Sequence, residues 1–393
     1  MPKALQYLTD ELNKLREQKL YQKLRILETE QLPVSCFDGR EVINLSSNNY
    51  LGLTTHPKLK RRAIEAIEKY GVGSGAVRTI AGTMSLHMDL EEKIARFKQV
   101  EASVVFQSGF TANAGTVAAI LTRDDVIISD ELNHASIIDG CRLSRAEIKV
   151  FPHKDVAACE EVLQGLSSHK GRKLLITDGV FSMDGDIAPL PQLVELAEKY
   201  GCIMMIDDAH ASGVLGRNGR GTVDHFKLHG RVDIQVGTLS KAIGSLGGYV
   251  CSTRDTIEYL YHRARPFLFS TSHPPSVAAS CIAAFEVLDE EPQLVERLWA
   301  NTRFFKAGLQ KLGFNTGHSE TPITPVIVGD AALAHQFSRE LFEGGVFAQG
   351  IGYPTVAQGK ARIRTIVTAT HTEDELKRAL EIMARVAKKL RIV

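Results

Sequence analysis

An acid, an imidazole and an amine follow two apolar stretches in the middle of the chain. Asp207 and His210 come directly after the run CIMMI, and Lys241 follows VDIQVGT within the segment TLSKAIG. An amine held in a partly apolar pocket has a lowered pKa and becomes a nucleophile toward an aldehyde. The three residues together indicate Schiff-base chemistry. The alternative is that Asp207 caps a helix and Lys241 is solvated.

Pyridoxal 5'-phosphate (PLP) is a cofactor whose chemistry needs both an amine and an acid. A carboxylate beside its pyridine nitrogen keeps that nitrogen protonated, and the protonated ring then withdraws electrons. Raising the pKa of the nitrogen by two units takes about 3 kcal/mol, which a buried charge-assisted hydrogen bond can supply. The sequence therefore favours PLP as the cofactor, and no metal site is expected.

The phosphate of PLP would need hydrogen-bond donors, and the segment around Gly109 and Phe110 offers them. It follows the strand-like VVFQ and opens the helix-like ANAGTVAAI, and backbone amides at a helix start bind anions. Thr238 and Ser240 can add hydroxyl groups. His134, in ELNHASIIDG, could stack on the cofactor ring, although a histidine beside a helix start can equally be a cap or a surface residue.

These residues must be positioned by an α/β fold. From about residue 100, short apolar runs alternate with helical stretches, and KLLITDGV, PQLVELAEKYG and CIMMIDDAH form one β-α-β unit. The carboxyl ends of strands in an open parallel sheet are where ligands collect, so we expect the candidate residues to converge there. We expect an N-terminal helical arm over residues 1–45, a large domain over 46–290 and a smaller α+β domain over 291–393.

Composition excludes several classes of protein. The 393 residues carry a formal charge of +1, with 24% charged and 44% hydrophobic residues, as in ordinary globular domains. The sequence has no run of 18 apolar residues and no Lys/Arg-rich block, so we expect a cytoplasmic protein with neither membrane nor nucleic-acid partners. Gly71 to Ala76 match G-x-G-x-x-A, but the helical LKRRAIEAIEKY precedes them where a dinucleotide site needs a strand. A turn is expected there.

The sequence resembles the α-oxoamine synthases, which are PLP-dependent transferases of fold type I, the aspartate-aminotransferase-like fold. The resemblance covers essentially the whole chain. The segments that carry it are SSNNYLGL, GSGAVRTIAGT, LNHASIIDG, DGVFSMDGDIAPL, DDAHASGVLG, GTLSKAIG, RPFLFSTS and ARIRTIVTATHT. They are specific together, whereas any one alone would be weak. The implied architecture is a large, mostly parallel sheet domain followed by a smaller α+β domain.

The resemblance also implies catalytic roles around the cofactor ring. Lys241 corresponds to the lysine that binds PLP as a Schiff base, and Asp207 to the partner of the pyridine nitrogen. His210 corresponds to the residue that hydrogen-bonds the phenolic oxygen, with Ser182 beside that oxygen. His134 corresponds to the histidine that stacks on the ring.

Other positions match the edges of the site. Gly109, Phe110 and Thr238 match phosphate-side positions, and Thr271 is expected to reach the phosphate of a neighbouring subunit. The resemblance thus implies a homodimer with shared active sites. Asn48 and Arg364 match positions near the carboxylate of the amino-acid substrate. Arg25 is either a contact for a distal acyl carboxylate or a helix-surface charge.

The implied reaction is a condensation of an amino acid with an acyl-CoA. NHASIIDG, RVDI, RPFLFS and GKARIRT resemble the glycine C-acetyltransferase branch, which joins glycine to acetyl-CoA to give 2-amino-3-ketobutyrate and CoA, and we take this reaction as the first expectation. SSNNYLGL, TLSKAIG, FSTSHPP and GDIAPL resemble as much the 8-amino-7-oxononanoate synthase branch, which condenses L-alanine with a pimeloyl thioester, with decarboxylation, in biotin synthesis. A promiscuous synthase and, more distantly, an aminotransferase are further alternatives.

Overall fold

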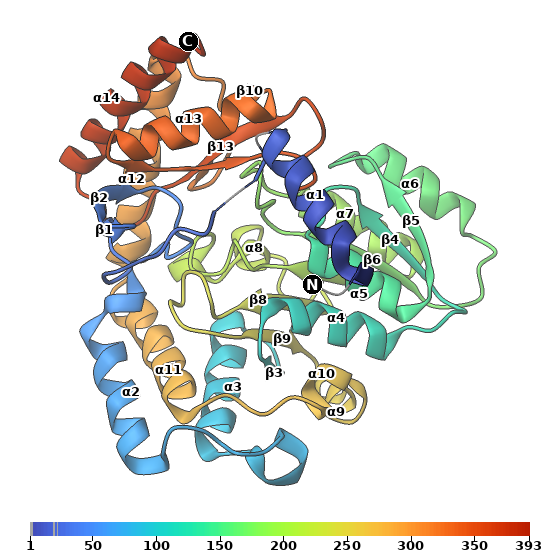
Figure 1. Ribbon diagram of the computed structural model, residues 1–393. Coiled ribbons are helices and arrows are strands. Elements are labelled where there is room, and N and C mark those ends of the chain that lie inside the picture. The colour runs from blue at the N-terminus through green and yellow to red at the C-terminus, as the bar shows by residue number, and fades with distance from the viewer. Residues whose placement is uncertain (1–2, 19, 22) are drawn as a thin grey trace. The chain divides into compact units, whose positions relative to one another are not determined.

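A computed structural model describes residues 3–18, 20–21 and 23–393 (Figure 1). The chain divides into two compact units. Unit 1 comprises Met1–Ser47, Met183–Gly185 and Arg297–Val393, and unit 2 comprises Asn48–Ser182 and Asp186–Glu296. Among the described residues, no helix is long and apolar enough to cross a membrane.

Unit 2 is built on a seven-stranded sheet in the order β3-β9-β8-β7-β6-β4-β5. Five neighbouring strands are parallel, and β9 pairs antiparallel with both β3 and β8. The strands are β3 (Ala102–Phe106), β4 (Val126–Asp130), β5 (Glu147–Phe151), β6 (Lys173–Asp178), β7 (Ile203–Asp207), β8 (Ile234–Thr238) and β9 (Gly248–Ser252). The mostly parallel sheet expected from the sequence is confirmed.

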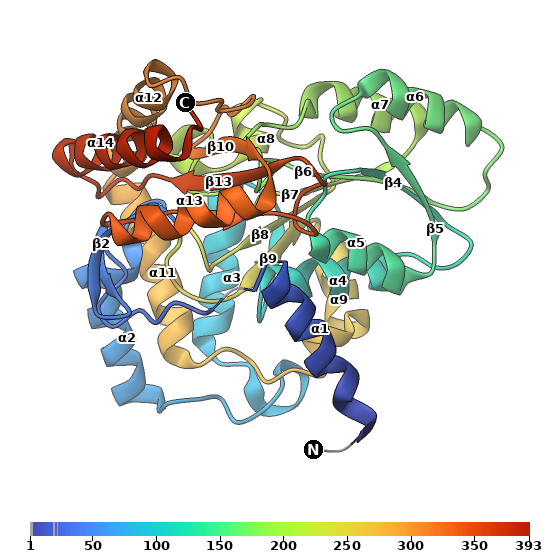
Figure 2. The same ribbon diagram turned by 45° about the horizontal axis from the view of Figure 1, so that its top comes forward.

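Helices cover both faces of this sheet (Figures 1 and 2). Ile176 and Met205 lie in one apolar cluster with residues of α4, α5, α9 and α10, whereas Leu175 and Met204 lie in another with residues of α6 and α7. Consecutive side chains of a strand point to opposite faces of the sheet, so neighbouring residues of one strand belong to different clusters. The helices are α2 (Pro57–Tyr70), α3 (Ser85–Lys98), α4 (Gly109–Ile120), α5 (Ala135–Ser144), α6 (Val156–Gly165), α7 (Leu190–Tyr200), α8 (Thr222–His225), α9 (Arg254–Arg263), α10 (Arg265–Leu268) and α11 (Pro275–Glu290).

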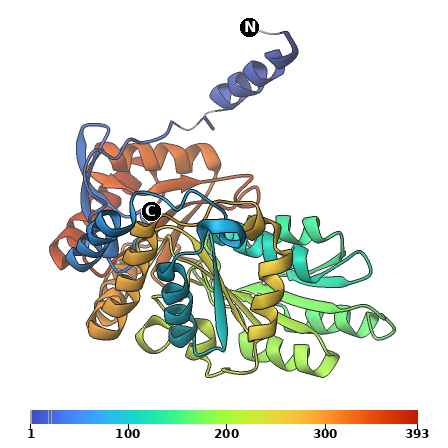
Figure 3. The same ribbon diagram turned by 90° about the horizontal axis from the view of Figure 1, so that it is seen from below.

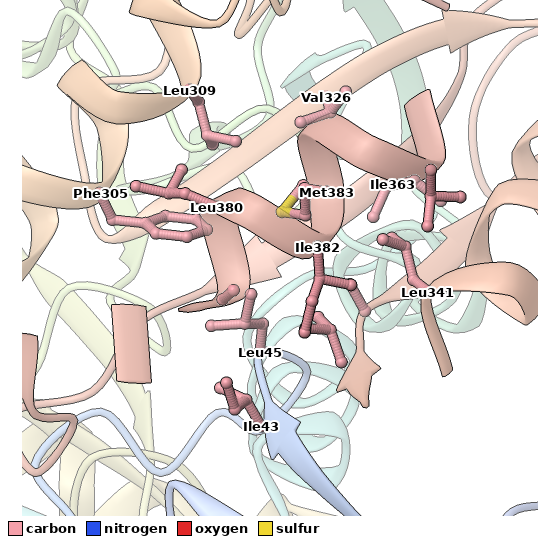
Figure 4. Close-up of a cluster of buried hydrophobic side chains, with 14 of the residues drawn as sticks. Ile43, Leu45, Phe305, Leu309, Val326, Leu341, Ile363, Leu380, Ile382 and Met383 are labelled. Atoms are coloured by element: carbon pink, nitrogen blue, oxygen red, sulfur yellow. The ribbon is translucent and has the colours of Figure 1, made fainter. Parts of the chain in front are cut away.

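Unit 1 contains two three-stranded sheets, β10-β13-β12 and β1-β2-β11. Its apolar core joins Leu309, Leu341 and Met383 from three helices to Ile363 of the central strand β13 (Figure 4). The elements are α1 (Gln6–Glu17), β1 (Val34–Phe37), β2 (Arg40–Asn44), α12 (Gln293–Lys311, whose first turn belongs to unit 2), β10 (Ile323–Gly329), α13 (Ala331–Glu343), β11 (Val346–Phe347), β12 (Gln349–Ile351), β13 (Ala361–Ile366) and α14 (Glu373–Leu390).

Two local expectations can be compared with the structure. The helix of the expected N-terminal arm is α1; none of its residues is buried, and it stands clear of the sheets of its unit (Figure 3). The glycines from Gly71 follow α2 rather than a strand, and Gly71 has a φ of +83°. That left-handed conformation suits a turn after a helix and not a dinucleotide site.

Candidate active site

The ends of three parallel strands in unit 2 bring polar side chains together. Asp178, Asp207 and Thr238 are the last residues of β6, β7 and β8, and Asp178 lies opposite Asp207 in the strand register. Because side chains alternate along a strand, Asp178 and Asp207 point to the same face as Ile176 and Met205, which is the face that α4 and α5 cover.

The carboxylate of Asp207 is buried and is held by neutral donors. Asp207 is 4% exposed; its Oδ2 accepts from Asn113 Nδ2 at 2.6 Å, and its Oδ1 accepts from the backbone N–H of Ala209 at 2.8 Å. Both of these donors are uncharged. Its negative charge is therefore available to a cationic ligand.

His134 lies at the N-cap of α5, as its position in the sequence suggested. Its Nδ1 accepts the N–H of Ser136 at 3.2 Å and lies 2.7 Å from Ser136 Oγ. Its own backbone N–H donates to Asp178 at 2.7 Å. Burial lowers the pKa of His134; the charge of Asp207 opposes this effect, and that of Lys241 adds to it. His134, Asp207 and Lys241 thus lie within electrostatic reach of one another.

Asp178 is a second buried acid in this group. Burial raises the pKa of Asp178 well above its ordinary value, and the neighbouring charge of Asp207 raises it further. Two carboxylates so close do not both ionise readily in a buried site. Asp207 accepts one side-chain and one backbone hydrogen bond, both of which favour a negative charge on its carboxylate.

His210 is held by a tyrosine that the sequence reasoning missed. Tyr50 Oη lies 2.7 Å from His210 Nδ1, and both residues are buried. Tyr50 belongs to SSNNYLGL, and a tyrosine in an otherwise polar turn was the available signal. Asn48 precedes it in the same turn, where its carbonyl accepts the N–H of Tyr50 at 2.8 Å.

The start of α4 forms a possible phosphate site. Ser108 caps the helix by accepting the N–H of Thr111 at 3.1 Å, and Gly109 and Phe110 are the first two helical residues. The first amides of a helix have no partner inside it, so they can bind an anion. A Cβ atom on Gly109 would lie 3.5 Å from Thr238 Cβ, which places the Thr238 side chain beside this helix start.

The remaining candidates lie at the periphery or in the other unit. Thr271 is exposed and pairs with Val77 in an isolated β-bridge, and Ser182 follows the buried Phe181 in the loop after β6. Arg364 lies in unit 1, on β13, opposite Pro325 and Gln349. Its contact with the substrate stays a prediction, as do the other roles.

Arg25 is not a helix-surface charge, whereas its contact with a distal acyl carboxylate stays a prediction. It lies outside the helices, its Nη1 is 3.1 Å from Asp38 Oδ2, and its guanidinium lies 3.5 Å from the centre of the Phe342 ring. Its charge is therefore already paired within unit 1.

Comparisons with known proteins agree with this architecture. A family model described as aminotransferase class I and II matches residues 40–383. An 8-amino-7-oxononanoate synthase from Symbiobacterium thermophilum is 61% identical over 98% of this chain and 99% of its own length. The chain belongs to the α-oxoamine synthase family. The 8-amino-7-oxononanoate synthase 1 of Bacillus subtilis is 57% identical over the full length of both chains.

Solved structures support the same family. Serine palmitoyltransferase from S. paucimobilis, with a bound PLP-myriocin aldimine, has a TM-score of 0.94 at 31% identity and covers 99% of both chains. The 8-amino-7-oxononanoate synthase of Francisella tularensis has a TM-score of 0.76 at 28% identity, over 88% of this chain and 98% of that one. The protein is accordingly a PLP-dependent enzyme of fold type I.

The residues of this α-oxoamine synthase fit PLP on structural grounds. A buried carboxylate held by neutral donors suits a protonated pyridine nitrogen, and the amides of Gly109 and Phe110 at the start of α4 suit a phosphate group. The comparisons correct one expectation: glycine C-acetyltransferase, taken first from the sequence, is not the activity of the relatives named above. They favour the alternative. The short segments quoted from the sequence pointed to both branches, so they could not separate the two activities.

Two buried polar residues behind Asp207 were also missed. Asn113 and Ser136 are at most 1% exposed, and Asn113 Nδ2 donates to both Asp207 and Ser136. The signal for Asn113 was a lone amide in the nearly apolar helix GFTANAGTVAAI, because a helix that is apolar all round is buried and its polar residues need partners.

Proposed function

We propose that the protein is an 8-amino-7-oxononanoate synthase, which condenses L-alanine with a pimeloyl thioester. The observation that carries this proposal is the 61% identity, over nearly the full length of both chains, with a relative of that name. In this reaction the alanine Cα forms a bond to the thioester carbon, the thiol leaves, and the alanine carboxyl group leaves as CO2. The product is 8-amino-7-oxononanoate.

Each candidate residue has a task in this reaction. PLP, when bound, supplies an electron sink for the charge that develops on the alanine Cα. Lys241 Nζ attaches the cofactor and later moves the Cα proton of the amino acid. Asp207 holds a proton on the pyridine nitrogen, and His210, supported by Tyr50, donates a hydrogen bond to the phenolic oxygen.

The outer residues bind and orient. The amides of Gly109 and Phe110 and the hydroxyl of Thr238 bind the phosphate group. Arg364 binds the alanine carboxylate by a bidentate contact, and Asn48 is a second residue that we assign to the amino-acid substrate. His134 stacks on the cofactor ring, and Ser182 lies near its phenolic oxygen.

The substrate can be tested by thiol release from the purified enzyme. L-Alanine with pimeloyl-CoA is compared with glycine and acetyl-CoA, and we expect clear preference for the first pair. Preference for glycine and acetyl-CoA would establish the other branch, and comparable rates would indicate a promiscuous synthase. Release from neither pair, with transamination of a keto acid, would indicate an aminotransferase.

The cofactor lysine has its own test. Lys241→Ala should remove both the visible absorbance of bound PLP and thiol release, because the side chain that attaches the cofactor is lost. Lys388→Ala, which changes an exposed lysine of α14, should alter neither. Retained absorbance and turnover in Lys241→Ala would overturn the assignment.

We also propose a homodimer with shared active sites. Large apolar side chains are exposed on unit 2: Val72 (78%), Ile80 (83%), Leu246 (52%) and Phe269 (71%). Phe269 lies two residues before Thr271 in the sequence. Ile80 lies three residues after Val77, which pairs with Thr271 in a β-bridge. Such exposed side chains are typical of a protein interface. Sedimentation should show a dimer, and Ile80→Glu together with Phe269→Glu should give inactive monomers.

A further inference from the structure

A continuous chain of hydrogen bonds joins Asp207 to the ring of His134. Asn113 Nδ2 donates to Asp207 Oδ2 at 2.6 Å and to Ser136 Oγ at 2.9 Å. Ser136 Oγ in turn lies 2.7 Å from His134 Nδ1. Asn113 is 0% exposed, so solvent does not compete for these bonds.

The chemistry of the groups fixes the direction of both bonds that Asn113 makes. A carboxylate only accepts, so one N–H of the Asn113 amide points to Asp207 and the other points to Ser136. The reverse orientation of the amide would place Oδ1 against the carboxylate, where two acceptors repel. The amide is therefore a double donor.

The direction continues to the histidine. Because Ser136 Oγ accepts from Asn113, its own hydrogen is free to point to His134 Nδ1. The backbone N–H of Ser136, 3.2 Å from the same nitrogen, also donates to it. Nδ1 thus faces two donors and carries no proton, and the proton of a neutral imidazole is then on Nε2.

We propose that Asn113 and Ser136 are positioning residues that keep His134 as the neutral Nε2–H tautomer and Asp207 as a carboxylate. This inference rests on the proposed places of His134 and Asp207 at the cofactor. A neutral ring stacked there does not compete with the pyridine nitrogen for the charge of Asp207. The proton on Nε2 also stays available for donation to a bound substrate.

The surrounding charges are compatible with a neutral imidazole. The groups that face His134 are Asp207 on β7, Asp178 on β6 and Lys241 after β8. Asp178 accepts the backbone N–H of His134 and not a ring hydrogen. Burial and the charge of Lys241 both lower the pKa of His134 against the opposing effect of Asp207.

Nitrogen NMR of histidine-labelled protein tests the tautomer directly. Spectra are recorded with and without PLP, and His134→Gln identifies the signals of His134. We expect a neutral ring with its proton on Nε2 at neutral pH, because the pKa of His134 is lowered from its ordinary value. A ring protonated on Nδ1, or on both nitrogens, would overturn the inference.

Two variants test the positioning role. Ser136→Ala should convert His134 to a mixture of tautomers and raise the pH at which the ring protonates. Asn113→Leu should do the same and weaken PLP binding, measured by titration of the cofactor absorbance, roughly tenfold, because Asp207 loses a donor to its charge. Unchanged tautomer and unchanged PLP affinity in both variants would overturn the proposal.

Thr116→Val is the matched control. Thr116 lies on the same helix α4, is 0% exposed, and its Oγ1 has no hydrogen-bond partner among the described residues. The control should leave the tautomer and PLP affinity unchanged. Failure of this inference can be told apart from failure of the proposed function. A protein that does not bind PLP would still show the tautomer of His134 in the cofactor-free spectrum.

Discussion

Asp207 and Asp208 are adjacent and buried, but their charges are compensated differently. Asp208 is 0% exposed and pairs with Lys98 Nζ at 2.7 Å. Burial alone would lower the pKa of Lys98, but the charge of Asp208 outweighs it and raises that pKa. Asp207 instead accepts hydrogen bonds from two neutral groups, the side-chain amide of Asn113 and the backbone amide of Ala209.

The difference separates a structural charge from a functional one. Lys98 also donates to Ser212 Oγ and to the carbonyl of Arg220, so the Asp208 pair ties together the loop that follows β7 and carries His210. A buried charge without a counter-ion costs stability and is retained where a ligand supplies the opposite charge. At Asp207 we propose that this ligand is the pyridinium of PLP.

The largest effect should follow from Asp207→Asn. We expect thiol release to fall by about 10³-fold, because an amide cannot hold the pyridine nitrogen protonated. The cofactor-free protein should unfold at an unchanged or higher temperature, because an uncompensated buried charge is removed. Turnover close to that of the wild type, or a large loss of stability, would abolish the distinction between the two acids.

Asp208→Asn should have the opposite pattern. It leaves the ammonium of Lys98 buried without its counter-charge, which costs about 3–5 kcal/mol in the free energy of unfolding. Urea unfolding of the cofactor-free protein measures the loss. If Asp208→Asn instead removed activity and kept stability, Asp208 and not Asp207 would be the functional acid.

His153 carries a positive charge that two carboxylates compensate and that is lost at high pH. Its Nδ1 lies 3.0 Å from Asp130 and its Nε2 lies 2.9 Å from Asp186. Burial opposes protonation, but the two carboxylates outweigh it and raise the pKa of His153 from 6.5 to about 9. Because the pKa is raised in the folded protein, the stabilisation is full below about pH 6.5 and is lost as the pH rises through about 9.

His153→Gln should therefore destabilise the protein by about 2–3 kcal/mol near pH 6 and by much less near pH 10. Urea unfolding at both pH values measures the difference. His262→Gln, which changes an exposed histidine of α9, should show no such dependence on pH. An effect of His153→Gln that is equal at both pH values would show that the ring acts by packing and not by charge.

Part of this organisation could be predicted from the sequence. The apolar runs before Asp207 and Lys241 predicted buried parallel strands, and strand ends predicted the site. The residue pattern by itself could not distinguish Asp207 from Asp208, and the family resemblance was needed to single out Asp207. The partner that distinguishes Asp208, Lys98, lies 110 residues away. β5 was missed because it is an edge strand with a largely exposed EIKVF sequence, and β11 because it has two residues and pairs with the distant β2.

The smallest effect should come from replacing both members of the compensated pair. The double variant Lys98→Met with Asp208→Leu removes both buried charges. If the Lys98–Asp208 pair is structural, this variant should recover most of the stability lost in Asp208→Asn. Apolar residues of similar volume often replace a buried ion pair without loss of stability. A residual cost of about 1–2 kcal/mol is expected, because the N–H of Thr222 and the carbonyl of Arg220 lose their partners. A double variant less stable than Asp208→Asn would mean that the pair stabilises the loop through its geometry. Charge compensation alone would then not explain the difference between the roles of Asp208 and Asp207.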